Sequence, residues 1–231
     1  MKALIRKTTS VWKTEEGVTL LLPLLVAIIF VAPFLREWFP FLAAASTAFL
    51  VLLFIVGALV VARNLWAGVA VSLLAGCAIS LEMVHQIQDA DPFAVWRLGT
   101  ACLTIGLFAA VTLARVFAPG PVTSHRLVGA VVAYLLLGLT WAYAYDWLEF
   151  MRPGSFYASG GVKEGAYPTL LYYSFVTLTT VGYGDVTPIS SAARALSNLE
   201  SLVGVLYPAV LIGRLLSMQV RGAPPEPPSP G

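Results

Sequence analysis

Apolar residues gather in six long stretches along the chain, separated by shorter connections that carry most of the polar and charged residues. A bilayer core of about 30 Å is crossed by a helix of about 20 mostly apolar residues. The stretches that approach or exceed this length are residues 18–35, 39–62, 65–84, 93–117, 127–147 and 192–216. The pattern predicts an all-α membrane protein with six transmembrane helices.

A shorter apolar run, residues 169–179, lies between the fifth and sixth stretches. It is too short to cross a bilayer as a helix, and runs of this length are typical of re-entrant segments. Pro168 fits the first turn of such a helix, where its missing N–H costs nothing. If the helix enters from the outer side, its partially negative C-terminal end points toward the membrane centre and favours a cation there.

Composition supports membrane insertion, because 58% of the residues are hydrophobic and only 11% are charged, too apolar for a soluble domain. Basic residues expected on the cytoplasmic side outnumber those on the other: Lys2, Arg6, Lys7, Lys13, Arg63, Arg115, Arg126, Arg214 and Arg221, against Arg36, Arg152 and Lys163. The positive-inside rule therefore predicts a multi-pass protein of the cell membrane with both termini in the cytoplasm. The charges form no basic face, so no nucleic-acid partner is expected.

The segment that follows the short helix carries the most specific motif of the chain. It reads Thr177-Leu178-Thr179-Thr180-Val181-Gly182-Tyr183-Gly184-Asp185. Gly182 and Gly184 can adopt a left-handed backbone without a Cβ penalty, and a backbone that alternates in this way points successive carbonyls toward one axis. Exposed carbonyls inside a membrane are tolerated only where they are buried in protein or line a cavity, so the motif predicts an ion or water path.

This motif matches the signature of the potassium channel pore family, and the resemblance covers residues 127–216. It implies a selectivity filter of residues 180–184, in which the carbonyls of Thr180, Val181, Gly182 and Tyr183, with the Thr180 hydroxyl, replace the water around a potassium ion. The permeant K⁺ is the only cofactor implied. Because each chain has one filter segment, four copies are expected to meet on an axis as a homotetramer surrounded by lipid.

The resemblance also implies roles for residues around the filter. Tyr172 and Tyr173 occupy the place of paired aromatic residues in relatives, and with Thr177 and Thr179 they are expected to support the filter from the short helix. Asp185 is expected at the outer mouth, where four copies form an anionic ring. Val176 stands where some relatives have a glutamate that couples to this aspartate.

Four regions are expected on this basis: a cytoplasmic N-terminal arm (1–17), a four-helix transmembrane domain (18–117), a pore domain (125–217) and a disordered Pro-rich tail (218–231). The tail cannot form a packed core, so no cytoplasmic ligand-binding domain is expected. The fourth stretch has no positive charge between Arg97 and Arg115. A voltage sensor needs several such charges within the membrane, so steep voltage gating is not expected.

Several residues of the last stretch leave two interpretations open. Gly204 and Pro208 are candidates for a hinge that opens the inner mouth, although Gly204 is equally suited to close helix packing. Glu200 is either a functional ionisable group or a hydrogen-bonded structural residue behind the filter. Arg194 and Arg214 are expected to anchor the helix ends near lipid headgroups or protein.

Alternative functions remain at this stage. An intramembrane protease needs an activated nucleophile with a positioned base, but His85 and His125 are the only histidines and are expected on opposite sides of the membrane. A poorly selective cation channel and a non-conducting regulatory subunit share the predicted fold. The sequence predicts no enzyme, and it specifies neither the gating stimulus nor the role of the first four helices.

Overall fold

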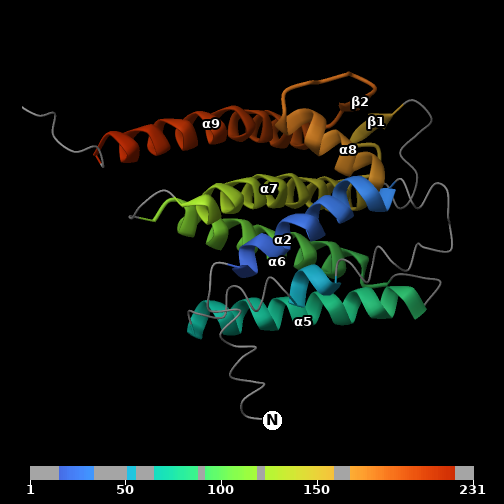
Figure 1. Ribbon diagram of the computed structural model, residues 1–231. Helices are drawn as coiled ribbons and strands as arrows, with labels where there is room; N and C mark the ends of the chain where they lie inside the picture. The colour runs from blue at the N-terminus through green and yellow to red at the C-terminus, as the bar shows by residue number, and fades with distance from the viewer. Residues whose placement is uncertain are drawn as a thin grey trace, which may run out of the picture.

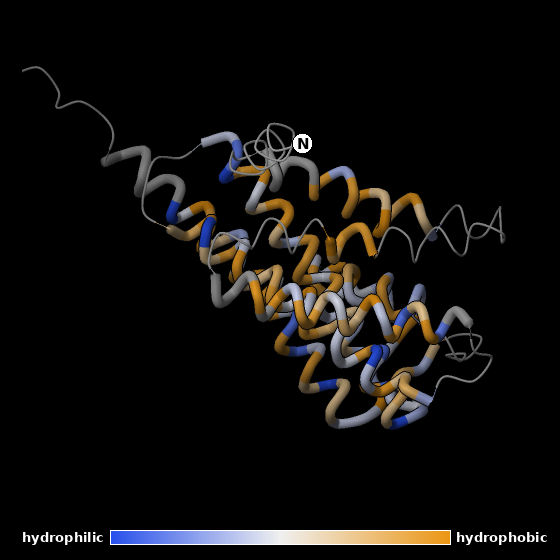
Figure 2. The backbone as a smooth tube through the Cα atoms, turned by 90° about the horizontal axis from the view of Figure 1, so that it is seen from below, coloured by the Kyte–Doolittle hydropathy of each residue, from blue (hydrophilic) through white to orange (hydrophobic). Residues whose placement is uncertain are grey.

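The computed structural model describes residues 16–33, 51–55, 65–87, 92–118, 123–158 and 167–221. Its elements are α2 (Glu16–Val26), the π-helix η1 (Ala27–Val31), α5 (Leu65–Ile87), α6 (Ala94–Val116), α7 (Ser124–Met151), β1 (Phe156–Ala158), α8 (Tyr167–Leu178), β2 (Val186–Pro188) and α9 (Ser191–Arg221). The described chain is therefore mostly helical, as the apolar stretches predict. Figure 2 shows that hydrophobic residues recur along the whole length of these helices.

Three of the described helices are long and apolar enough to cross a membrane: Ala94–Val116, Ser124–Met151 and Ser191–Arg214. They correspond to the fourth, fifth and sixth predicted spans. The first and third predicted spans contain shorter apolar helical segments, Leu21–Val31 and Val71–His85. Most of the second predicted span, like most of the N-terminal arm and of the tail, lies outside the described residues. The tail was expected from residue 218, but α9 continues to Arg221.

The helices pack in the order α5, α6, α7, α8 and α9, with α2 also against α7 (Figure 1). Buried aliphatic and aromatic residues from α6 and α7, including Ile105, Phe108, Leu136 and Leu139, form the larger core. A second cluster joins the C-terminal half of α7 to α8 and α9, and its members include Tyr145, Phe156, Leu170, Tyr173 and Ala193. Helix α7 therefore lies between the N-terminal helices and the C-terminal part of the chain.

Side-chain caps set the starts of two of the long helices. The Thr123 hydroxyl accepts a hydrogen bond from the backbone N–H of Arg126 at the start of α7. The Ser190 hydroxyl accepts one from the backbone N–H of Ala193 at the start of α9. Each bond satisfies a first-turn N–H that has no partner within the helix.

One two-stranded sheet is a feature that the all-α prediction leaves out. Strands β1 and β2 pair antiparallel, with Tyr157 opposite Thr187. The pairing continues beyond the strands, because the Ser155 carbonyl accepts from the N–H of Ile189 at 2.7 Å. Three-residue strands are too short to show an apolar alternation, and their pairing depends on a contact distant in sequence. This two-stranded sheet connects the residues that follow α7 to the residues that precede α9.

Candidate functional site

Helix α8 spans 12 residues and rises about 18 Å, which is too short to cross a bilayer core of about 30 Å. The chain then folds back on the end of this helix. The N–H groups of Val181 and Gly182 both donate to the Val176 carbonyl, at 2.9 and 3.3 Å, and that of Thr180 donates to Thr177 at 3.0 Å. Within the described part of the chain, no backbone hydrogen bond ends on the carbonyls of residues 180–183.

The backbone of this segment alternates in conformation. Gly182 and Gly184 have φ of 58° and 81°, and Thr180 has φ of 59°, whereas Val181 and Tyr183 between them do not have positive φ. The left-handed conformation expected at both glycines is confirmed. Thr180 was not predicted to share it, because a β-branched residue rarely adopts positive φ. Residues Thr180 to Asp185 are all exposed in the single chain.

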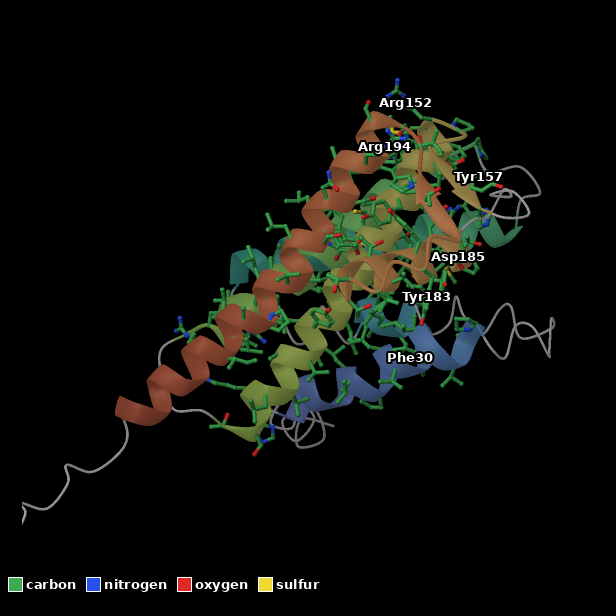
Figure 3. The ribbon with its side chains drawn as sticks, turned by 90° about the horizontal axis from the view of Figure 1, so that it is seen from above. Phe30, Arg152, Tyr157, Tyr183, Asp185 and Arg194 are labelled. Atoms are coloured by element: carbon green, nitrogen blue, oxygen red, sulfur yellow. The ribbon has the colours of Figure 1, made fainter. Side chains whose placement is uncertain are left out.

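Tyr172 and Asp185 join α8 to the end of this segment. The Tyr172 hydroxyl donates to the Asp185 carboxylate at 2.8 Å, and the Tyr172 ring stacks on Tyr183 with 6.4 Å between centroids and 2° between planes. The hydrogen bond to Asp185 raises the pKa of the Tyr172 hydroxyl. Figure 3 shows Tyr183 and Asp185 on this segment. The second oxygen of Asp185 accepts from the N–H of Val186 at 3.1 Å.

The other predicted support residues face different surroundings. Tyr173 is buried, its hydroxyl lies 2.6 Å from the Ser197 hydroxyl of α9, and its ring contacts Tyr145 and Phe156. The Thr179 hydroxyl donates to the Phe175 carbonyl of its own helix at 2.6 Å. The Thr177 carbonyl accepts the N–H of Thr180, so this part of α8 supports the segment through its backbone.

Glu200 lies fully buried where α7, α8 and α9 meet. Its two carboxyl oxygens lie 2.5 Å from the Tyr145 hydroxyl and 2.6 Å from the Ser174 hydroxyl. Of the two interpretations of Glu200, these contacts support the hydrogen-bonded structural residue. Sequence reasoning missed both partners. The signal available was that an ionisable residue in an apolar span requires polar partners from neighbouring spans.

Gly204 and Pro208 both lie inside α9, which continues as one helix through them. A Cβ placed on Gly204 would lie 1.9 Å from the Leu178 carbonyl oxygen at the end of α8. Of the two interpretations of Gly204, close packing is the one that this geometry supports. The same carbonyl accepts a hydrogen bond from Tyr134 of α7 at 3.2 Å.

The arginines of α9 contact protein groups at both ends of the helix. Arg194 donates to the Pro188 carbonyl at 3.2 Å. The Arg214 guanidinium lies 5.5 Å from the centre of the Phe117 ring at the end of α6. Phe117 in turn packs edge-on against Tyr207, whose hydroxyl donates to the Ala130 carbonyl of α7 at 2.7 Å. The contacts of Tyr207 and Arg214 connect the C-terminal half of α9 to α6 and α7.

Comparison with known proteins identifies the stretch from α7 to α9. Residues 129–221 match the ion channel family. Three relatives are each similar to part of the chain: "Two pore potassium channel b" of Oryza sativa subsp. japonica, 38% identical over 44% of this chain and 25% of its own length; "Two pore potassium channel c" of the same plant, 34% identical over 38% and 17%; and "Probable potassium channel protein 2" of Methanocaldococcus jannaschii, 35% identical over 43% and 25%.

The chain spans a quarter or less of the length of each of these three relatives. No solved structure matches the chain. The resemblance to potassium channels that the sequence predicts is confirmed for this stretch by the family match and by the names of the relatives.

Proposed function

Because residues 129–221 match the ion channel family and relatives of the chain are named potassium channels, we propose that this chain is a subunit of a potassium-selective channel. Four copies surround one axis, and the carbonyls of Thr180, Val181, Gly182 and Tyr183, with the Thr180 hydroxyl, bind K⁺ as it passes. The family match supports a transport protein rather than an enzyme.

One observation carries the proposal: left-handed φ at Thr180, Gly182 and Gly184 directly after the C-terminus of a short helix. Left-handed residues at every second position turn each peptide plane relative to the next, so that consecutive carbonyls face the same side. Carbonyls without backbone donors need another partner inside a membrane. A dehydrated K⁺ ion supplies that partner, and the partially negative end of α8 favours its charge.

The remaining residues take supporting roles in this proposal. Asp185 contributes to an anionic ring at the outer mouth, and Tyr172, Tyr173, Thr177 and Thr179 hold the filter against α8. Helix α8 is the re-entrant pore helix of a six-span protein of the cell membrane with cytoplasmic termini. Residues 18–117 form the four-helix domain, 125–217 the pore domain, and the flanking segments the arm and the tail.

Ion flux through the purified protein in liposomes tests the proposal. We expect K⁺ uptake to exceed Na⁺ uptake strongly, and Gly182→Ala to abolish K⁺ uptake. An L-residue held at the φ of 58° of Gly182 costs about 1–2 kcal/mol in each subunit.

Gly154 provides a matched control, because it also has positive φ, at 82°, but lies in the turn before β1. Gly154→Ala is therefore expected to retain K⁺ uptake. Equal uptake of Na⁺ and K⁺ by the wild-type protein would favour a poorly selective cation channel. Reconstituted wild-type tetramer without any flux would favour a non-conducting subunit.

A further inference from the structure

Glu200 is the fully buried carboxyl group at the junction of three helices in the proposed pore domain. It projects from α9, while Tyr145 belongs to α7 and Ser174 to α8. Each of its oxygens lies beside one hydroxyl group, Oε2 2.5 Å from Tyr145 and Oε1 2.6 Å from Ser174. The Ser174 hydroxyl has a second neighbour, the Gly138 carbonyl oxygen of α7, at 2.8 Å.

If Glu200 is ionised, these contacts have fewer hydrogen-bond protons than they need. A serine hydroxyl carries one hydrogen, and neither a carboxylate nor a backbone carbonyl can donate. Ser174 can therefore donate either to Glu200 or to Gly138, and the other contact would bring two oxygen lone pairs together at 2.6 or 2.8 Å. A proton on the Glu200 carboxyl group removes this conflict, because it lies between Oε1 and the Ser174 oxygen and leaves the Ser174 hydrogen for the Gly138 carbonyl.

The surroundings of Glu200 also disfavour a buried negative charge. No lysine, arginine or histidine forms an ion pair with Glu200 in the part of the chain that the structure describes. An unpaired carboxylate is costly to bury, and two neutral hydroxyl donors replace only part of its hydration. A neutral carboxylic acid avoids this cost and supplies the missing proton.

We infer that Glu200 is held as a neutral carboxylic acid that donates from Oε1 to Ser174, while Ser174 donates to the Gly138 carbonyl and Tyr145 donates to Oε2. Each hydroxyl group in this chain of bonds then donates one hydrogen bond, and one proton lies between the two oxygens of each contact. On the proposed function, this chain positions the pore helix between α7 and α9. It does so without adding a negative charge behind the K⁺ path.

The neighbouring pair Tyr173 and Ser197 shows what a link without an acid looks like. Ser197 lies 2.6 Å from the Tyr173 hydroxyl and 2.8 Å from the Ala193 carbonyl. Tyr173 can donate to Ser197 and Ser197 to Ala193, so no further proton is required. This pair also joins α8 to α9, which makes it a matched control.

Infrared spectroscopy of protein labelled with ¹³C at the glutamate carboxyls tests the protonation state directly, without any ion current. At neutral pH we expect a carbonyl band typical of a protonated carboxylic acid in the wild type and its loss in Glu200→Gln. Glu82→Gln is expected to keep the band, because Glu82 pairs with Arg97 at 3.4 Å. A wild-type spectrum without this band, or one in which Glu200→Gln leaves it unchanged, overturns the inference.

Replacement of Glu200 tests the positioning role. Glutamine can donate an N–H to Ser174 and accept from Tyr145, whereas alanine leaves Tyr145 without its acceptor and Ser174 without the donor that Glu200 supplies. We expect Glu200→Ala to lower K⁺ uptake into liposomes by about tenfold or more, and Glu200→Gln to restore most of it. Tyr173→Phe, which removes the control link, is expected to be milder than Glu200→Ala.

If glutamine is as damaging as alanine, the carboxylate form is the one that matters and the inference fails. Ser174→Ala provides a second variant, since it should remove the infrared band or shift it markedly while Glu200 itself is retained. An unchanged band in that variant would also contradict the chain of bonds. A wild-type protein that carries no K⁺ would reject the proposed function alone, because the infrared result does not depend on transport.

Discussion

Tyr172 acts on the proposed filter through two different atoms of one side chain. Its hydroxyl donates to Asp185 at 2.8 Å, and its ring lies parallel to that of Tyr183. Both contacts connect α8 to the C-terminal end of the left-handed segment. In the proposed channel, these side chains restrain the outer part of the filter.

Tyr172→Phe separates the two contacts, since it keeps the ring and removes the hydroxyl. We expect severalfold shorter channel openings with unchanged preference for K⁺ over Na⁺, because the carbonyls remain while Asp185 loses a restraint. Single-channel recording in planar bilayers measures both quantities. Tyr157→Phe removes an exposed tyrosine hydroxyl on β1 and serves as the control. Openings of wild-type length in Tyr172→Phe would show that the hydrogen bond has no role.

At the scale of elements, α9 approaches the end of α8 so closely that the two backbones touch at Gly204. Only a residue without a side chain permits this approach. The Leu178 carbonyl is among the last four of α8 and lacks a helical partner, and Tyr134 supplies a donor to it. The crossing therefore fixes the position of Leu178, after which the proposed filter segment begins.

Gly204→Ala tests this crossing, because the added Cβ would lie 1.9 Å from the Leu178 carbonyl oxygen. We expect a loss of about 1–3 kcal/mol of stability, measured as a lower thermal unfolding midpoint in detergent. Gly213 has nothing within 4 Å of the corresponding position. Gly213→Ala is therefore expected to be neutral or to stabilise α9 by up to about 1 kcal/mol. Equal midpoints for the two variants would refute the packing role of Gly204.

On the proposed function, the charges of α6 predict how the channel responds to voltage. Arg97 lies in its first turn and pairs with Glu82 of α5 at 3.4 Å, and the next charge is Arg115 in its last turn. Each charge that crosses the membrane field contributes about 2.3 kcal/mol per 100 mV, so a helix without internal charges drives no steep opening. We expect conductance to vary little with voltage in bilayer recordings, in the wild type and in Arg97→Gln. A steep sigmoidal conductance curve would contradict this expectation.

At the scale of the whole molecule, the single chain leaves apolar side chains exposed along α9. They include Leu199, Leu202, Val205, Leu206, Val210 and Ile212. Val181 and Tyr183 of the proposed filter are exposed as well, 52% and 71%. Lipid can cover apolar helix faces, but it cannot satisfy the carbonyls of the filter. Assembly around an ion provides for both in the proposed tetramer.

Removal of K⁺ tests the assembly. If carbonyls from four chains bind the ion together, K⁺ stabilises the tetramer and not the separate subunits. We expect the tetramer to dissociate at a lower temperature in Na⁺ than in K⁺, followed by light scattering or native gels. Gly182→Ala should lose this difference, and Gly154→Ala should retain it. A wild-type protein with the same dissociation temperature in both salts would argue against shared K⁺ sites.

Sequence reasoning predicted the features of this protein that depend on local rules. The long helices α6, α7 and α9 follow from apolar stretches of membrane length, since every backbone group in lipid must be bonded within its own segment. The left-handed glycines, 182 and 184, follow from the absence of a Cβ. Glu200 was identified as unusual because a carboxyl group in an apolar span is costly.

Tertiary structure decided which of these residues meet. Tyr145 and Ser174 lie 55 and 26 positions from Glu200, and many hydroxyls of the spans were equally available as partners. Gly204 was open to two interpretations until α9 was seen to cross the end of α8. The β1–β2 pair and the left-handed Thr180 were not predicted at all. Contacts of this kind depend on how helices are rotated and spaced, which apolar periodicity leaves undetermined.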